Sequence, residues 1–278
     1  MHAAIDSFMA GIHRLSRIHP ITPWCVGLVL LIPLPWIATN NYQIYLLNHI
    51  CIMIILATGL NVVKGFAGQV TVGHVALAAV GAFTSAVLST KFGMPFWVCM
   101  PVAVCVTVIT GAIVAVPSFR LEGAYLALAT LAFAQSVEIF IRITNYLGAA
   151  SGIGGVQPPS FFGIVLRDYG AYYYLVMPLT VLAVYASFAI LKSATGRAFM
   201  AIREDPLSAA ATGVNVKRFK LLAFMLSAAY AGLAGSLMAH MLPGYIHPNN
   251  FTIIEMVVVL LMVVLGGIGH IWGGVIGA

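Results

Sequence analysis

The sequence has 278 residues, of which 62% are hydrophobic and only 7% are charged, and its mean hydropathy is +1.03. Soluble domains are about 25% charged, so the composition excludes a soluble enzyme and indicates an integral membrane protein. The four cysteines lie in apolar stretches, which excludes a secreted disulfide scaffold. The net charge of +6 does not indicate nucleic-acid binding here, because basic residues of a membrane protein report its orientation instead.

Transmembrane helices need about 20 mostly apolar residues. The apolar runs are continuous and lack the ten-residue alternation of a β-barrel. They predict an all-α, polytopic bundle of about eight transmembrane helices in a single domain over residues 1–278. The expected spans are 22–39, 44–63, 74–90, 95–117, 121–141, 171–191, 220–241 and 253–277.

The first apolar run follows Arg14 and Arg17, as in a signal peptide. Cleavage after Ala38 would place Trp36 at the −3 position, where a small residue is required. A retained first helix is therefore expected.

Basic residues predict the orientation of these spans. With the N-terminus in the cytoplasm, the outer segments hold three basic residues, Lys91, Arg142 and Arg167. The inner segments then hold the other ten: Arg14, Arg17, Lys64, Arg120, Lys192, Arg197, Arg203, Lys217, Arg218 and Lys220. This asymmetry supports eight spans with both ends inside.

Two connections are long. Residues 142–170 are rich in glycine and proline, which predicts an outer, turn-rich connection rather than a domain. Residues 192–219 form the inner loop and hold a helix signal: Asp205 can cap a helix start, Pro206 suits the first helical position, and Gly213 can end the helix. Since so short a helix is unstable alone, it packs either on this protein or lipid, or on a partner.

A second unusual segment runs from Gly65 to His74 at the edge of the third span. Irregular backbone at membrane depth is tolerated only where protein or water satisfies it. A pore-lining or re-entrant role is one interpretation for Gln69, Thr71 and His74. The other, favoured for any single residue, is a cytoplasmic turn with His74 capping a helix start.

Few polar groups lie within the spans. Asn48 and His49 are expected to make interhelical hydrogen bonds rather than substrate contacts. The intramembrane acids Glu138 and Glu255 suggest proton coupling. A structural or vestibule role is favoured, because each acid falls near the outer interface, where it could reach water or pair with Arg142. Small residues spaced four apart, such as Gly232 with Ser236, indicate close helix packing.

Three stretches of sequence resemble the LivM type of branched-chain amino-acid permease in ATP-binding-cassette importers. They are GLNVVKGFAGQVTVGHVALAAVGAF from residue 59, GAYLALATLAFAQSVEIF from residue 123 with SGIGGV from residue 151, and GRAFMAIREDPLSAAATGVNVKRFKLLAFMLSAAYAGLAGSL from residue 196, continued by LLMVVLGGIGHIWGGVIGA. The resemblance covers most of the chain beyond residue 44. Family members continue past the position of Ala278, so an abrupt last span or an absent later helix is expected.

The resemblance implies the importer-permease fold and a transport subunit of the bacterial inner membrane, not an enzyme. It implies a LivH-like sister permease, two cytoplasmic ATPase subunits and a periplasmic solute-binding protein as partners. No cofactor and no metal are expected, and the scattered histidines lack metal-ligand spacing. None of the five lysines follows a glycine, so the chain has no P-loop and the energy must come from those ATPases.

The resemblance also identifies the inner loop, 192–219, as the coupling loop. Its helix would fit a groove on an ATPase subunit and act as a lever. The expected coupling residues are Arg203, Glu204, Asp205, Pro206, Ala209, Ala210 and Gly213, of which the first three would make polar contacts at the rim.

Two other classes compete with this interpretation. A self-sufficient secondary transporter or channel for a small neutral solute should show paired broken helices, and the sequence shows one break, at 65–73. A structural membrane protein would not need a capped cytoplasmic helix. The scarcity of buried charge fits a conduit for branched-chain amino acids, and equally one for urea, amides or a sugar.

Overall fold

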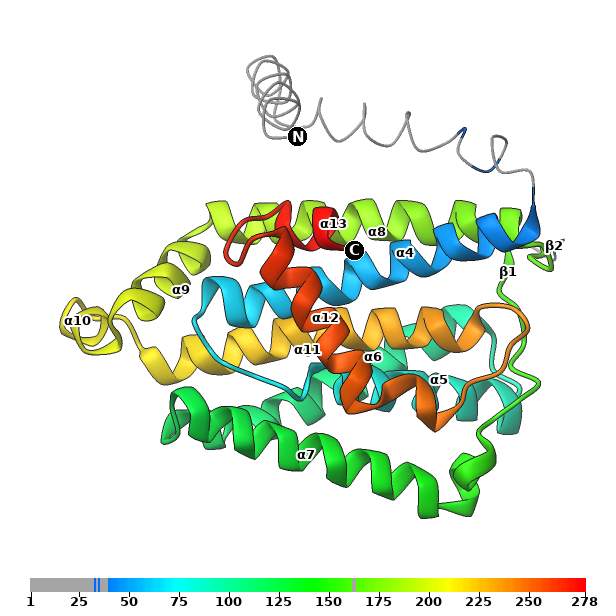
Figure 1. The fold of residues 1–278 in the computed structure, drawn as a ribbon, viewed down its shortest axis with the longest axis horizontal. Helices are drawn as coiled ribbons and strands as arrows, with labels where there is room; N and C mark the ends of the chain where they lie inside the picture. Colours follow the sequence, from blue (N-terminus) through cyan, green and yellow to red (C-terminus); the bar gives the residue numbers. More distant parts are fainter. Residues whose placement is uncertain (1–32, 34, 36–39, 162–163) are drawn as a thin grey trace.

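The computed structural model describes residues 33, 35, 40–161 and 164–278. Long helices run side by side and α12 crosses them obliquely (Figure 1). The long elements are α4 (Asn41–Leu60), α5 (His74–Lys91), α6 (Phe96–Ala115), α7 (Gly123–Ile143), α8 (Tyr169–Lys192), α11 (Val216–His240) and α12 (Ile253–Gly266).

Shorter elements connect these helices. They are the π-helix η1 (Asn61–Phe66), the 3-10 turns η2 (Pro117–Phe119), η3 (Asn145–Leu147), η4 (Ala149–Ser151) and η5 (Pro248–Phe251), and the helices α9 (Ala194–Glu204), α10 (Pro206–Ala211) and α13 (Gly273–Gly277). The strands β1 (Ser160–Phe161) and β2 (Ile164–Val165) pair antiparallel in the predicted turn-rich connection.

Five helices of the described chain are long and apolar enough to cross a membrane: Asn41–Phe66, Phe96–Phe119, Ala124–Ile143, Tyr169–Lys192 and Val216–His240. They confirm five of the predicted segments, and α5 confirms the helix expected at 74–90. The expected first span, 22–39, lies outside the described residues. The count of eight therefore stays a prediction.

The last predicted span, 253–277, is wrong as a continuous helix. Helix α12 ends at Gly266, and Gly267 and Gly269 then take φ angles of +107° and +80°, which side chains disfavour. The chain turns back, and α13 packs on α12 so closely that a Cβ at Gly266 would overlap the carbonyl of Gly273. A hydropathy pattern does not register such a turn, because glycines and their apolar neighbours suit both a span and a reversal.

Helix α11 lies at the centre of the bundle, against α4, α5 and α6. Glycines allow this contact: a Cβ at Gly232 would lie 2.9 Å from Thr107 Cβ on α6, and one at Gly111 would lie 2.4 Å from Ala228 Cβ. The predicted small-residue packing is confirmed within this chain for Gly232. In lipid, where helices gain no hydrophobic drive to associate, such close approach supplies the packing energy.

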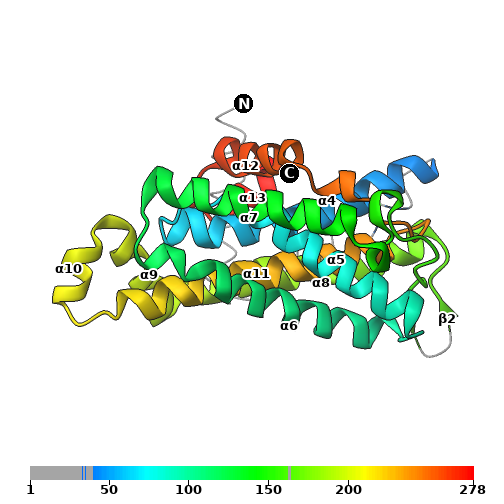
Figure 2. The ribbon, with the colours of Figure 1, turned by 90° about the horizontal axis from the view of Figure 1, so that it is seen from below.

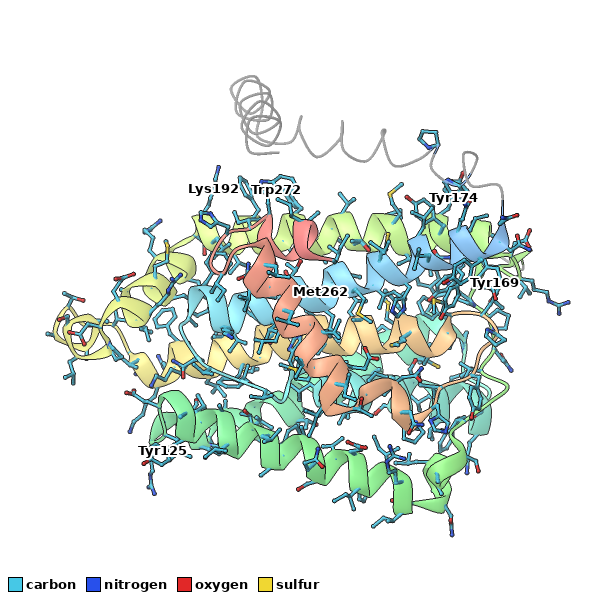
Figure 3. The ribbon with its side chains drawn as sticks, viewed as in Figure 1. Tyr125, Tyr169, Tyr174, Lys192, Met262 and Trp272 are labelled. Carbon is cyan, nitrogen blue, oxygen red and sulfur yellow. The ribbon has the colours of Figure 1, made fainter. Side chains whose placement is uncertain are left out.

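The bundle has two distinct ends, and α7 forms one of its edges. Tyr125 and Lys192 lie toward the end that carries α10, whereas Tyr169 and Tyr174 lie toward the other (Figure 3). Helix α7 runs along the edge (Figure 1) and packs mainly on α5. Its other side exposes large apolar side chains, including Tyr125 at 73%. This face is suited to lipid or to another membrane subunit.

Candidate functional site

The capped helix predicted after Asp205 is present as α10. The Asp205 carboxylate accepts hydrogen bonds from the backbone amides of Leu207 and Ser208 at 3.0 and 3.2 Å, and from the Ser208 hydroxyl at 2.5 Å. Hydrogen bonds from the Ser208 hydroxyl and the Leu207 amide lower the pKa of Asp205 from its ordinary value. Pro206 takes the first position and Gly213 adopts φ +89°, so the predicted start and stop signals are confirmed.

Helix α10 projects beyond the end of the bundle in both views (Figures 1 and 2). Ala209 is buried against the chain, whereas Leu207 is 82% exposed and Ala210, Ala211 and Gly213 are also exposed. An exposed leucine flanked by small residues makes a surface that another protein can approach closely. Glu204, at the end of α9, is exposed beside it.

Arg203 bonds within the chain rather than standing only at the rim of the loop. Its Nη1 donates to the carbonyl oxygen of Gly65, 2.6 Å away in η1. A Cβ at Gly68 would lie 3.1 Å from Arg203 Cγ, so the irregular segment passes directly over this side chain. The segment that precedes α10 is therefore joined to the break predicted after Gly65, a link across 138 residues that sequence analysis missed.

Asn61 fastens the same break to the C-terminal turn. Its Oδ1 accepts from the Gly269 amide at 3.0 Å, and its Nδ2 donates to the His270 carbonyl at 2.6 Å. A Cβ at Gly269 would lie 2.4 Å from Arg203 Nη1, so the three segments meet without spare room. We call Asn61, Gly65, Arg203, Gly269 and His270 the junction.

The turn at Gly267 also corrects the sequence analysis, which found one break only. The described chain is irregular between helices at 67–73 and again at 267–272, and the π-helix η1 just before the first stretch bonds to the second stretch at the junction. The only sequence signal of the second break was its glycine content, which also fits close helix packing.

The three residues considered for a translocation path are buried within this chain. Gln69 Nε2 donates to the Ala67 carbonyl at 3.2 Å, and Thr71 Oγ1 accepts from the Gly73 amide at 3.3 Å. These bonds are local and hold the irregular turn that follows η1.

His74 does not cap the helix that it begins, so that part of the favoured interpretation is wrong. Its Nε2 donates to the Leu56 carbonyl of α4 at 2.9 Å, because a carbonyl can only accept. Its Nδ1 therefore accepts from the Ser227 hydroxyl of α11, also at 2.9 Å. The imidazole ties three helices together instead of satisfying the amides at its own helix start.

A cavity of about 220 Å³ opens between the break and the coupling loop. It is lined by Ala67, Gly68, Gln69, Val70, Glu122, Gly123, Leu126, Ile202, Arg203 and Pro206. Gln69 thus shares a cavity with two predicted coupling residues, while Thr71 and His74 do not line it. The opposite charges of Arg203 and Glu122 make this the polar cavity at the α10 end.

Two other predicted polar contacts are confirmed and one is not. Arg142 pairs with Glu138 at 2.9 Å, and Asn48 Nδ2 donates to the Tyr169 carbonyl of α8 at 3.0 Å. The hydrogen bond expected for His49 is absent among the described residues, where its buried Nδ1 has no partner. At the α10 end, Lys220 bonds to Glu122 at 2.8 Å. Within the part of the chain that the structure describes, no group of three His, Cys, Asp or Glu side chains could hold a metal ion.

Comparison with known proteins places this arrangement in a family. The sequence model of the family described as "Branched-chain amino acid transport system / permease component" matches residues 42–278. The chain is 36% identical over 242 residues to the high-affinity branched-chain amino acid transport system permease protein LivM of Escherichia coli K12, and equally to that of Salmonella typhimurium LT2.

Each of these alignments covers 78% of this chain and 57% of the relative, so the chain spans little more than half the length of the curated relatives it matches. No solved structure matches it. The match over nearly all described helices shows that the chain is a multi-pass membrane protein belonging to the family of branched-chain amino acid transport system permease components.

Proposed function

We propose that the chain is a transmembrane permease subunit of an ATP-binding-cassette importer in the bacterial inner membrane. With a sister permease of the LivH type it forms the path for branched-chain amino acids or similar small polar or amide solutes. A periplasmic binding protein delivers the solute, and two cytoplasmic ATPase subunits supply the energy, so the chain itself is not an enzyme. The N-terminus and the α10 end face the cytoplasm, as the basic residues predict.

The observation that carries this proposal is α10 itself. It is too short to be stable alone, it is capped by Asp205, and it presents Leu207 and Ala210 beyond the bundle. A helix held in this way serves as a docking element for a soluble subunit, and Leu207 is its anchor.

The junction connects the docked helix to the segment that follows α4. Movement of α10 displaces Arg203 at the end of α9, and Arg203 is bonded to Gly65 in the interrupted segment after α4. Gln69 lies in the cavity between them. We therefore assign Gln69, with Thr71 and His74 behind it, to the inner part of the path that α10 opens and closes.

Transport by the reconstituted system tests the proposal. The chain, its sister permease and the ATPases are placed in proteoliposomes with the binding protein, and uptake of radiolabelled leucine, urea and a sugar is measured. We expect leucine uptake that requires both ATP and the ATPases. Leucine uptake by the permeases alone, driven by an ion gradient, would contradict the proposal.

A second candidate function, a self-sufficient secondary transporter for a small neutral solute, is favoured by one observation. The two interrupted segments that meet at the junction resemble the discontinuous helices of such transporters. Proteoliposomes that hold only this chain decide between the two functions: accumulation of solute under a proton or sodium gradient supports the second, and its absence supports the importer.

A further inference from the structure

Two opposite charges stand together on α7, toward the end of the bundle away from α10. Arg142 donates to Glu138 Oε1 through Nη2 at 2.9 Å and through Nε at 3.1 Å, and Nη2 also donates to Asn249 Oδ1 of η5 at 2.8 Å. The side chains of Arg142 and Glu138 remain 34% and 18% exposed. Within the described residues, these bonds leave Glu138 Oε2 and Arg142 Nη1 available to a ligand.

A line of residues spaced four apart runs along α7 and includes this pair. Its members are Thr130, Ala134, Glu138 and Arg142, each of which neighbours the next on the helix surface, and all but Ala134 are polar. Thr130 accepts from the Val72 amide at 3.0 Å, just after Gln69 in the interrupted segment. The line thus runs from the neighbourhood of the α10-end cavity to the Arg142 end of α7.

One side of the pair is enclosed and the other is open. Gln135 and Glu138 line a narrow crevice with Thr252, the N-cap residue of α12, among mainly apolar side chains. The crevice measures about 10 Å³, the room of a single water molecule. An amino acid does not fit there, and Arg142 is partly exposed, so a ligand would reach the pair from the exposed side of α7.

Charged side chains within a transmembrane helix cost free energy, and a functional role would account for that cost. Glu138 lies five residues before the end of α7, about 7 Å into the helix. An ionised side chain in a transmembrane segment is expensive, whereas an i,i+4 ion pair that water can reach returns little. An ionisable residue within a transmembrane segment is therefore a candidate for contact with the solute.

We propose that Glu138, Arg142 and Asn249 form a contact site for the zwitterionic head of an α-amino acid. Arg142 Nη1, which carries no bond within the described residues, binds the carboxylate, a charge-assisted hydrogen bond, and Glu138 Oε2 binds the ammonium group. A neutral pair of opposite charges matches a neutral zwitterion, so passage leaves no charge uncompensated. This inference rests on the proposed function. It adds a solute-contact site at the outer end of the path and the chemical group recognised there.

The test uses the complete reconstituted importer. Glu138→Gln and Arg142→Gln should each lower leucine uptake at least tenfold, while ATP hydrolysis stimulated by the binding protein stays above half of the wild-type rate. Arg167→Gln, another exposed arginine outside α7, is the matched control and should transport normally. Full uptake by either single variant overturns the inference.

Charge reversal separates recognition from a structural ion pair. The double variant Glu138→Arg with Arg142→Glu keeps the pair but reverses its direction, and we expect uptake to stay low. Recovery to the wild-type rate would show that the pair only stabilises the helix.

If loss of charge prevents assembly, the variant Arg142→Lys keeps the charge and removes the planar guanidinium. Lowered uptake with normal assembly supports the inference, and full uptake opposes it. Failure of the wild-type complex to use ATP would instead refute the proposed importer function.

Discussion

At the scale of single residues, several polar side chains join segments that are remote in sequence. Arg203 reaches Gly65, Asn61 reaches Gly269 and His270, and His74 reaches Leu56 and Ser227. In a membrane interior an unmatched polar group is costly, so each of these bonds fixes a relation between helices. Asp205 differs because its bonds are local and lie in water.

Removal of the Asp205 cap should weaken coupling. In Asp205→Ala the amides of Leu207 and Ser208 lose their acceptor, so α10 frays and leucine uptake should fall several-fold. Asp205→Asn is the matched control, since its side-chain oxygen still caps the helix. Equal uptake by the alanine and asparagine variants would show that the cap does not matter for coupling.

The cap also predicts a pH dependence. The pKa of Asp205 is lowered in the folded chain, so its contribution is fully present above the ordinary pKa of an aspartate and is lost as pH falls through the lowered value. Between about pH 7 and pH 5, protonation of Asp205 should therefore not weaken the binding of the ATPases to wild-type proteoliposomes. If Asp205→Asn binds no differently from wild type at pH 5 and only wild type weakens in stronger acid, the titrating group is identified.

At the scale of elements, the exposed side of α10 and the glycine turn after α12 are the two features that the proposed mechanism needs. Helix α10 presents its exposed side to the proposed ATPase subunits, and the glycine turn completes the junction that contacts Arg203. Both are short segments whose conformation depends on proline, glycine and capping residues rather than on hydropathy.

A bulky charge on α10 should block docking without unfolding the bundle. Ala210 is exposed, so Ala210→Glu changes the docking surface and leaves the core intact. We expect the ATPases to be lost from the purified complex and uptake to fall to background. Ala194→Glu introduces the same charge at an exposed position of α9 and should retain the ATPases. If the Ala210→Glu variant retained the ATPases, α10 would not be part of the docking surface.

A side chain at Gly269 should disrupt the junction. Gly269 has φ +80° and no room beside Arg203, so Gly269→Ala adds a clash to a backbone cost of about 1–2 kcal/mol. Gly93→Ala has a similar φ of +62° with open space around it, and it controls for the backbone term. We expect Gly269→Ala alone to lose uptake while ATP hydrolysis continues, measured on the same proteoliposomes.

At the scale of the whole molecule, α11 organises the bundle and α7 forms its exposed edge. Small residues bring α11 against α5 and α6, and the His74 bonds connect α4, α5 and α11 at one point. The edge helix has few such ties, as expected for a surface that meets lipid or a second permease.

Loss of the His74 ring should destabilise the whole bundle. His74→Ala removes a second donor from the Leu56 carbonyl, leaves the buried Ser227 hydroxyl without its partner and opens a cavity, and a buried unsatisfied group costs about 1–3 kcal/mol of stability. Ser227→Ala removes only one of the two bonds and should shift the thermal midpoint by less. Unfolding of the two variants in detergent, followed by circular dichroism, checks the order. A larger shift for Ser227→Ala would contradict it.

Much of this protein could be predicted from sequence because the signals are local. Hydropathy located α4 to α8 and α11, glycine and proline marked the long turns, and Asp205, Pro206 and Gly213 defined α10 to within a residue, whereas α9 was not predicted. Neighbouring residues alone decide these features. The Glu138–Arg142 pair was predictable for the same reason, since it needs only a spacing of four on one helix.

The sequence by itself determined the membrane class, the course of most helices and the capped helix, while the tertiary structure decided the junction, the turn at Gly267 and the contacts of His74. The bond between Asn61 and Gly269 spans 208 residues, and that between Arg203 and Gly65 spans 138. The composition of a glycine-rich apolar run does not distinguish a membrane span from a reversal of the chain. The neighbour against which the run packs selects between the two.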